Sequence, residues 1–256
     1  MTSLAGLLVV LVASAPGAAS APTVRAELVG DGSRVGVRFV IPRGKHIYWS
    51  NPGDSGLPTK VVFSLPPGYR AGPVRWPVPE KFVQPGDITG FGYDRELVLW
   101  TDIGMPAGGG KPGSKIAATV TWLECDNREC VAGHAELVAE WPPPAIPQLF
   151  DRWSAKLPES GATAKPGGTA GSWEISIPWG RRSGKIRWVA AADPRVAVTD
   201  VVIRNGGKSS VVACSVGPVP GVSLPRGEYE IVAAYGTFWG DTKGVAVRVP
   251  AGGSGK

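Results

Sequence analysis

The segment from Ile116 to Trp141 constrains the fold of this 256-residue chain more than any other. Apolar residues occupy every second position on both sides of a polar break at 126–129, a pattern typical of two antiparallel strands joined as a β-hairpin. Cys125 ends the first strand and Cys130 begins the second. Facing residues in such a pair have Cα atoms about 4.5–5.5 Å apart, a separation that a disulfide can span. The hairpin can therefore hold its two thiols oxidised or reduced with little backbone movement.

The rest of the chain also has the pattern of strands separated by turns. Its 36 glycines and 25 prolines fall mostly between alternating apolar runs. We predict an all-β protein of two immunoglobulin-like β-sandwich domains joined by a short helix and a Gly/Pro-rich linker. The expected parts are a signal peptide at 1–21, a first sandwich at 22–145, the helix and linker at 146–172, and a second sandwich at 173–250.

Three segments carry more specific expectations. Residues 147–157 have an apolar stripe at helical spacing, which predicts a helix packed on one of the sandwiches, and residues 161–172 are expected to be a flexible linker. The prolines of segment 76–82 lack ladder donors, so it should be an extended crossing or an edge strand. Tyr229 begins a late strand and is a candidate tyrosine corner, in which the hydroxyl bonds back to the backbone.

The N-terminus is typical of a secretory signal. An apolar run from Leu4 to Ala15, too short to span a bilayer, precedes the small residues GAASA, so cleavage is expected near Ala19 or Ala21. A tethered N-terminus is the alternative, because no Lys or Arg precedes the run and Pro22 disfavours a cut at Ala21. No later segment is suited to crossing a membrane. We therefore expect an exported protein in a compartment where disulfides can form, without stable membrane insertion once the signal is removed.

The net charge of +6 does not by itself indicate nucleic-acid binding. No recognised nucleic-acid-binding motif accompanies the charge, so a solvated surface of strands and turns is the interpretation that we favour, and no nucleic-acid partner is expected. The densest basic group consists of Arg181, Arg182, Lys185 and Arg187.

Four stretches in order along the first half carry a resemblance to a known family. They are HIYWSNPGDSGLP at 46–58, WPVPEKF at 76–82, GFGY at 90–93, and the cysteine hairpin with GHAEL at 133–137. Together they resemble the N-terminal periplasmic domain of the thiol:disulfide interchange protein DsbD and its suppressor-of-copper-sensitivity relatives. The resemblance implies an immunoglobulin-like domain that needs no cofactor. Its cysteine pair would relay electrons from a membrane-embedded donor of the DsbD type to periplasmic thioredoxin-like proteins.

The resemblance also implies roles for individual residues. Cys130 would form the mixed disulfide with a partner, and Cys125 would resolve it. An aromatic cap would come from the loop between Phe82 and Tyr93, with Phe91 as the capping residue. His46 and Tyr48 would line the site, because they occupy the strand that lies beside the cysteines in relatives. This chain departs from many members in having Val131-Ala132 where a proline often follows the second cysteine.

A structural disulfide is the main alternative to a redox-active one. A closed loop of about six residues stabilises a fold by roughly 2 kcal/mol, whereas a bond from Cys125 to Cys214 would close about ninety residues and give more than about 4 kcal/mol. A bond across a hairpin that is already paired adds little, which favours redox function. The alternative function is a non-catalytic immunoglobulin-like binding protein of the envelope with a structural hairpin disulfide.

Two further properties of the cysteines can be predicted. Glu124, Asp126 and Glu129 are expected to raise the thiol pKa values, opposed only by Arg128. Cys214 lies in an apolar strand and should be a buried, inert thiol, with pairing as the minority alternative.

A metal site is a further alternative for the cysteine pair. We expect none, because one of the potential ligands, His134, begins an alternating strand in which an exposed polar residue is ordinary. The thiolates and imidazoles that would form such a site are those of Cys125, Cys130, His134 and His46.

Overall fold

A computed structural model of the chain describes residues 21–179, 184–236 and 242–250. Apart from its last residue, the predicted signal peptide lies outside the described residues, and so do Arg181 and Arg182 of the basic group. Within the described ranges, no helix combines the length and the hydropathy that a bilayer crossing needs.

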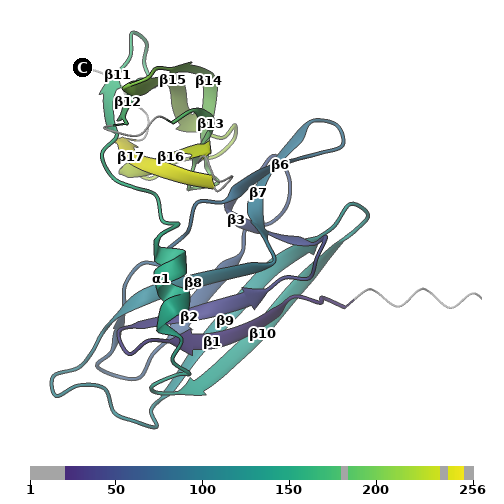
Figure 1. The fold of residues 1–256 in the computed structure, drawn as a ribbon, viewed down its shortest axis with the longest axis vertical. Coiled ribbons are helices and arrows are strands. Elements are labelled where there is room, and N and C mark those ends of the chain that lie inside the picture. Colours follow the sequence, from purple (N-terminus) through teal and green to yellow (C-terminus); the bar gives the residue numbers. More distant parts are fainter. Residues whose placement is uncertain (1–20, 180–183, 237–241, 251–256) are drawn as a thin grey trace, which may run out of the picture.

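The first half of the chain forms two sheets packed face to face (Figure 1). One sheet has the strand order β1-β2-β8-β5, and the other has the order β10-β9-β3-β7-β6, with β4 paired to β9. The strands are β1 Arg25–Gly30, β2 Arg34–Val40, β3 His46–Gly53, β4 Lys60–Ser64, β5 Arg70–Ala71, β6 Glu80–Gln84, β7 Ile88–Asp94, β8 Glu96–Gly104, β9 Lys115–Cys125 and β10 Cys130–Glu140.

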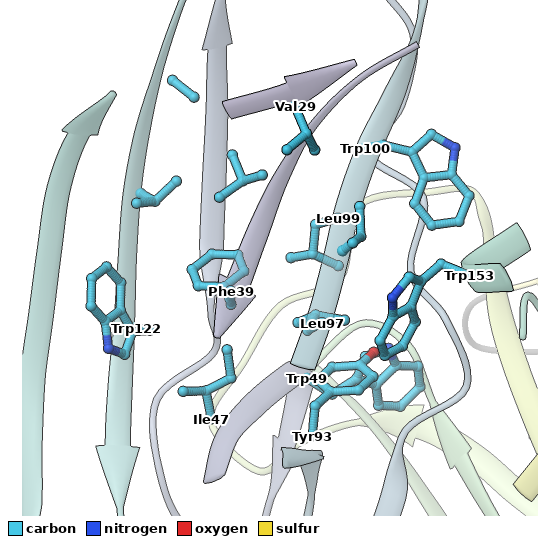
Figure 2. Close-up of a cluster of buried hydrophobic side chains, with 14 of the residues drawn as sticks. Val29, Phe39, Ile47, Trp49, Tyr93, Leu97, Leu99, Trp100, Trp122 and Trp153 are labelled. Atoms are coloured by element: carbon cyan, nitrogen blue, oxygen red, sulfur yellow. The ribbon is translucent and has the colours of Figure 1, made fainter. Parts of the chain in front are cut away.

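The core of this first sandwich lies between its two sheets (Figure 2). Phe39 of β2 meets Trp122 of β9 edge to face, with ring centroids 5.9 Å apart. Gly133 of β10 lies opposite Trp122, and a Cβ there would lie 2.0 Å from the indole ring. Glycine is therefore required at position 133 so that this indole can lie against the neighbouring strand.

Segment 76–82 has the predicted edge character. Its prolines precede β6, and β6 is the last strand of its sheet, paired with β7 alone. A strand at an edge needs backbone donors on one side only, which is why the neighbouring prolines are tolerated.

The predicted helix is shorter than expected and packs on the first sandwich. Helix α1 spans Pro147–Ser154, so Leu157 lies beyond its end. Its residues Leu149, Phe150 and Trp153 are buried, and the ring of Phe150 lies 6.2 Å from that of Trp100 on β8. The apolar stripe is thus confirmed as a packing surface.

The second half also forms two facing sheets, with a core of its own. Their strand orders are β11-β12-β15-β14 and β13-β16-β17. The strands are β11 Thr163–Pro166, β12 Ser172–Pro178, β13 Ile186–Ala191, β14 Val196–Asn205, β15 Ser209–Pro218, β16 Glu228–Gly236 and β17 Thr242–Pro250.

The prediction that 161–172 is a flexible linker is wrong for part of that segment. Residues 163–166 form β11, which pairs with β12, because backbone donors and acceptors at this sheet edge provide partners that the composition does not reveal. Two other expectations are confirmed: the Tyr229 hydroxyl donates to the Pro225 carbonyl over 2.8 Å, and Cys214 is a buried free thiol.

The all-β prediction is confirmed, whereas the domain boundaries stay a prediction. One hydrophobic cluster includes the core of the first sandwich and four residues of the second. The two sandwiches therefore share buried surface. The four residues are Trp188, Ala190, Val232 and Ala234.

Candidate redox site at the hairpin

Cys125 and Cys130 form a disulfide at the end of the β9–β10 hairpin. They face each other in the register, with Cα atoms 4.1 Å apart, and the pairing continues without a shift to Lys115 and Glu140. The hairpin and the position of the cysteine pair in it are thus as predicted. The bond connects two residues that the strand pairing already places together.

The loop between the cysteines is organised by one carboxylate. Asp126 Oδ1 accepts from the backbone N–H groups of Arg128 at 2.7 Å and Glu129 at 3.0 Å. These backbone bonds lower the pKa of Asp126. Because the bonds lie within the loop, they keep the strand ends together whether or not the sulfurs are joined.

The two cysteines differ sharply in exposure. Cys125 is 1% exposed, whereas Cys130 is exposed. The cause is the sheet order: Cys125 lies on β9 between β3 and β10, whereas Cys130 begins the edge strand β10. A partner can therefore approach the sulfur of Cys130 more readily than that of Cys125.

His46 and Tyr48 of β3 lie on the buried side of the disulfide. His46 is directly opposite Cys125 in the register, and Tyr48, two residues on, shares its face of the strand. The Tyr48 hydroxyl donates to Cys125 Sγ over 3.4 Å. The structure thus places both residues beside the cysteine pair.

Phe82 covers this pair of side chains from β6. Its ring centroid lies 4.3 Å from that of His46 and 5.8 Å from that of Tyr48. The space for the ring comes from Gly90 and Gly92 of β7, because a Cβ on Gly90 would lie 2.2 Å from the Phe82 ring and one on Gly92 3.2 Å from it. The two glycines of GFGY therefore form a flat surface for an aromatic ring.

Phe91 and Tyr93 point to the other face of β7. The ring of Phe91 lies 4.8 Å from that of Trp188, and the Tyr93 hydroxyl donates to the Pro77 carbonyl over 2.7 Å. Because successive residues of a strand face opposite ways, neither can join Phe82 on the side of the disulfide. The structure therefore groups Phe82 with His46 and Tyr48 and separates Phe91 and Tyr93 from them.

A short chain of polar contacts leads from a loop to the buried sulfur. Ser55 Oγ donates to Gln84 Oε1 over 3.2 Å, and Gln84 Nε2 donates to the Tyr48 hydroxyl over 3.4 Å. A Cβ on Gly56 would lie 2.4 Å from the Tyr48 ring, so glycine is needed where this loop crosses the tyrosine. Sequence reasoning missed Gln84, because nothing local indicates that β6 reaches Tyr48.

The carboxylate of Glu124 is engaged with Lys45 and with residues before β1, whereas its expected effect on the thiol pKa values stays a prediction. It lies on the opposite face of β9 from Cys125, 1% exposed, and its oxygens accept from Thr23 Oγ1 at 2.6 Å and from the backbone N–H groups of Thr23 and Val24 at 2.7 Å. Lys45 Nζ lies 2.6 Å away. Burial raises the pKa of Glu124, but the bonds from Lys45 and the N-terminal residues outweigh it, and the pKa is lowered overall.

The sequence carried one signal for this ion pair with a buried carboxylate. Glu124 continues the alternation of Val120 and Trp122, so it falls on the apolar face of β9, where a carboxylate requires a partner. The identity of that partner, Lys45, depends on how β3 pairs with β9 and could not be predicted locally.

The imidazole of His46 is partly buried beside the disulfide. Burial lowers its pKa, against the opposing charges of Asp126 and Asp94. Its Nε2 is buried and has no hydrogen-bond partner among the described residues. Over those residues, no group of three or more His, Cys, Asp or Glu side chains is placed to hold a metal ion, and His134 instead lies 3.3 Å from Glu136.

Solved structures of known proteins show which fold this chain shares. The likeness to the crystal structure of the N-terminal periplasmic domain of ScsB from Proteus mirabilis has a TM-score of 0.58 at 18% identity and covers 90% of this chain and 93% of that chain, which shows a shared fold. Two other solved structures are too dissimilar to support an argument. The match to the YadV chaperone has a TM-score of 0.23 at 10% identity and covers 89% of this chain and 98% of that chain. The match to the Bacillus cereus major pilin subunit BcpA*(D312A) has a TM-score of 0.26 at 13% identity and covers 91% of this chain and 67% of that chain.

The family comparison covers the segment that contains the hairpin. A comparison with curated proteins found no match. Residues 16–141 match the family described as "Thiol:disulfide interchange protein DsbD, N-terminal", and they include both hairpin cysteines, His46, Tyr48 and Phe82. This segment of the chain therefore belongs to the DsbD N-terminal family of thiol:disulfide interchange proteins.

Proposed function

We propose that the chain is a periplasmic thiol–disulfide exchange protein that relays two electrons through Cys125 and Cys130. The observation that carries the proposal is the disulfide with one exposed and one buried cysteine, at a hairpin end flanked by aromatic side chains. Membership of residues 16–141 in the DsbD N-terminal family supports it. The partners would be thioredoxin-like proteins on the acceptor side and a membrane-embedded protein of the DsbD type on the donor side.

The exchange would proceed through a mixed disulfide. In the reduced protein, the thiolate of Cys130 attacks one sulfur of a partner's disulfide, so that a bond forms between the two proteins and the partner's other sulfur leaves as a thiolate. The thiolate of Cys125 then attacks Cys130 Sγ, which restores the internal disulfide and releases the partner's second thiolate. Two electrons have then passed to the partner, whose thiolates take up two protons from solvent.

The residues around Cys125 would assist the second step. The Tyr48 hydroxyl donates toward Cys125 Sγ, and a donor at that position stabilises a thiolate more than a thiol. Phe82, rather than Phe91, would be the cap that shields the disulfide until a partner docks, because its ring is the one packed on His46 and Tyr48. Phe91 faces Trp188 instead.

Single-cysteine variants test the assignment of roles. Cys125→Ser should accumulate a mixed disulfide with an oxidised thioredoxin-like protein through Cys130, and Cys130→Ser should give neither the trapped complex nor electron transfer. Cys214→Ser is the matched control and should transfer electrons like the wild type, because Cys214 is buried in the other sandwich. Transfer by Cys130→Ser at the wild-type rate would overturn the assignment.

The reduction potential separates exchange from a structural role. Structural disulfides of secreted proteins have potentials below about −300 mV, whereas exchange-active bonds are less negative. We expect the Cys125–Cys130 bond to lie on the less negative side when it is equilibrated against a glutathione or dithiothreitol series. A value well below that limit would favour the non-catalytic binding protein instead.

A further inference from the structure

The centre of the sheet β13-β16-β17 of the second sandwich is buried on both faces. On β16, Ile231, Ala233 and Tyr235 belong to the core of the second sandwich. The residues between them, Val232 and Ala234, belong to the cluster of the first sandwich. This explains why the centre of β16 is a continuous apolar run and not an alternating one. The second sandwich therefore packs the central part of one sheet face against the first.

A bulge in β13 directs a tryptophan toward the first sandwich. The register of β13 against β16 shifts between Ile186 and Trp188. Residues two apart on a regular strand share a face, yet Ile186 lies in the second core and Trp188 in the first cluster. Bulges change the direction of a side chain in this way. The bulge thus places Trp188 at the boundary, meaning the buried contact between the two sandwiches.

Trp188 meets β7 and β3, the two strands that lie under Phe82 and beside the disulfide. Its ring centroid is 4.8 Å from that of Phe91 on β7 and 6.5 Å from that of Trp49 on β3. The opposite face of β7 carries the glycines under Phe82, and the opposite face of β3 carries His46 and Tyr48. Trp188 therefore supports, from behind, the strands on which the cap is built.

Polar contacts across the boundary involve the same group of strands. On β3, Ser50 Oγ donates to the Ala192 carbonyl over 2.9 Å and Asn51 Nδ2 to the Ala191 carbonyl over 2.8 Å. At the start of β6, Thr242 Oγ1 donates to Glu80 Oε2 over 2.5 Å. In Figure 1, β6 and β7 extend from the first sandwich toward the second and lie to the side of β16.

The attachment of these strands to the disulfide hairpin is short by comparison. Strand β3 pairs with β9 at only two positions, His46 with Cys125 and Ile47 with Glu124. Beyond them β3 has a register shift against β7, and its Ser50 and Asn51 bond to the second sandwich. The position of Phe82, His46 and Tyr48 relative to the disulfide thus depends on contacts made by both sandwiches.

We propose that the second sandwich is a brace that holds β3, β6 and β7 with their Phe82 cap closed over the Cys125–Cys130 disulfide, and that Trp188 is its principal positioning residue. The inference rests on the exchange function proposed above and gives the second sandwich a role in it. Loosening the boundary raises the fraction of molecules in which the disulfide is uncapped, without altering any residue that touches the sulfurs.

The test is the rate at which a small phosphine reduces the disulfide in the full chain, followed by intact mass. Trp188→Ala should raise the second-order rate constant by about tenfold, and Trp188→Phe should restore most of the wild-type value. Asn51→Ala and Thr242→Val each remove one contact across the boundary and should raise the rate by about fivefold. These two milder variants decide the question if Trp188→Ala does not fold.

Two matched variants control for general loss of stability. Trp173→Ala removes a buried indole from the core of the second sandwich, and Thr101→Val removes a hydroxyl that donates to the Gly72 carbonyl in the first. Both should leave the rate within about twofold of the wild type. Equal rates in the boundary variants and the wild type would overturn the proposal, and so would an equal rise in the controls.

The phosphine assay needs no protein partner, so it is independent of the proposed function. If the wild-type protein reacts with phosphine but with no thioredoxin-like protein, the exchange function fails while the coupling between Trp188 and the cap is still measured. If exchange with partners occurs and the boundary variants do not change the phosphine rate, the brace fails and the exchange function stands.

Discussion

Reduction of the Cys125–Cys130 bond should cost the fold little. The bond closes a loop of about six residues, and the chain-entropy relation gives about 2 kcal/mol for a loop of that size. The strands on either side are paired without a shift along their whole length, and Asp126 bonds the loop from within. Most of what holds the hairpin together is therefore present in the dithiol form.

The same quantity limits the reduction potential. Reduction and unfolding form a thermodynamic cycle. The free energy by which the disulfide stabilises the folded protein therefore equals the extra free energy needed to reduce the bond in the folded protein rather than in the unfolded chain. For a two-electron couple, 2 kcal/mol corresponds to about 45 mV. Folding should therefore make the bond only slightly harder to reduce than it is in the unfolded chain, which suits a bond that must open and close in each exchange.

Urea unfolding of the oxidised and reduced wild-type protein, followed by tryptophan fluorescence, measures this difference directly. We expect the free energy of unfolding to fall by about 2 kcal/mol on reduction, with the protein folded in both states. Cys214→Ala should show the same difference, because its thiol takes no part in the bond. A loss above about 5 kcal/mol, or unfolding on reduction, would refute the reasoning and indicate a structural staple.

Four further outcomes can be checked. Phe82→Ala should raise the rate of disulfide reduction by a small phosphine about tenfold, and an unchanged rate would exclude Phe82 as the cap. Burial lowers the pKa of His46, so that as the pH falls the unfolded chain takes up this proton before the folded protein does. The contribution of neutral His46 to the free energy of unfolding is therefore complete above pH 6.5 and is lost as the pH falls through the folded pKa. His46→Phe should lose that part of the pH dependence in urea unfolding at pH 7.5 and 5.5, and an identical pH dependence would contradict the assignment. Glu124→Gln should lower the free energy of unfolding, because the charge-assisted bonds from Lys45, Thr23 and Val24 to the buried carboxylate are weakened; an unchanged free energy would contradict this. Burial raises the pKa of Cys214 to about 11, so iodoacetamide at pH 8 should label it only after unfolding; rapid labelling of the native protein would show that it is accessible.

Several features of this protein follow from the sequence alone because they are local. Period-2 alternation and a four-residue polar break are properties of neighbouring residues, so they predicted the β9–β10 hairpin and the facing cysteines. The tyrosine corner at Tyr229 and the buried Cys214 were predictable for the same reason.

Other features were decided by the tertiary structure. Alternation separates Phe91 from the glycines beside it, but which face of β7 meets the disulfide depends on the pairing of β7 with β3 and β6. Only that pairing groups Phe82, rather than Phe91, with His46 and Tyr48.

Long-range pairing also decided the remaining contacts. Lys45 became the partner of Glu124, and Trp188 turned toward the first sandwich, because strands distant in sequence met in a particular register. A local pattern shows which residues of a strand share a face, whereas the assembled sheets determine what lies against each face.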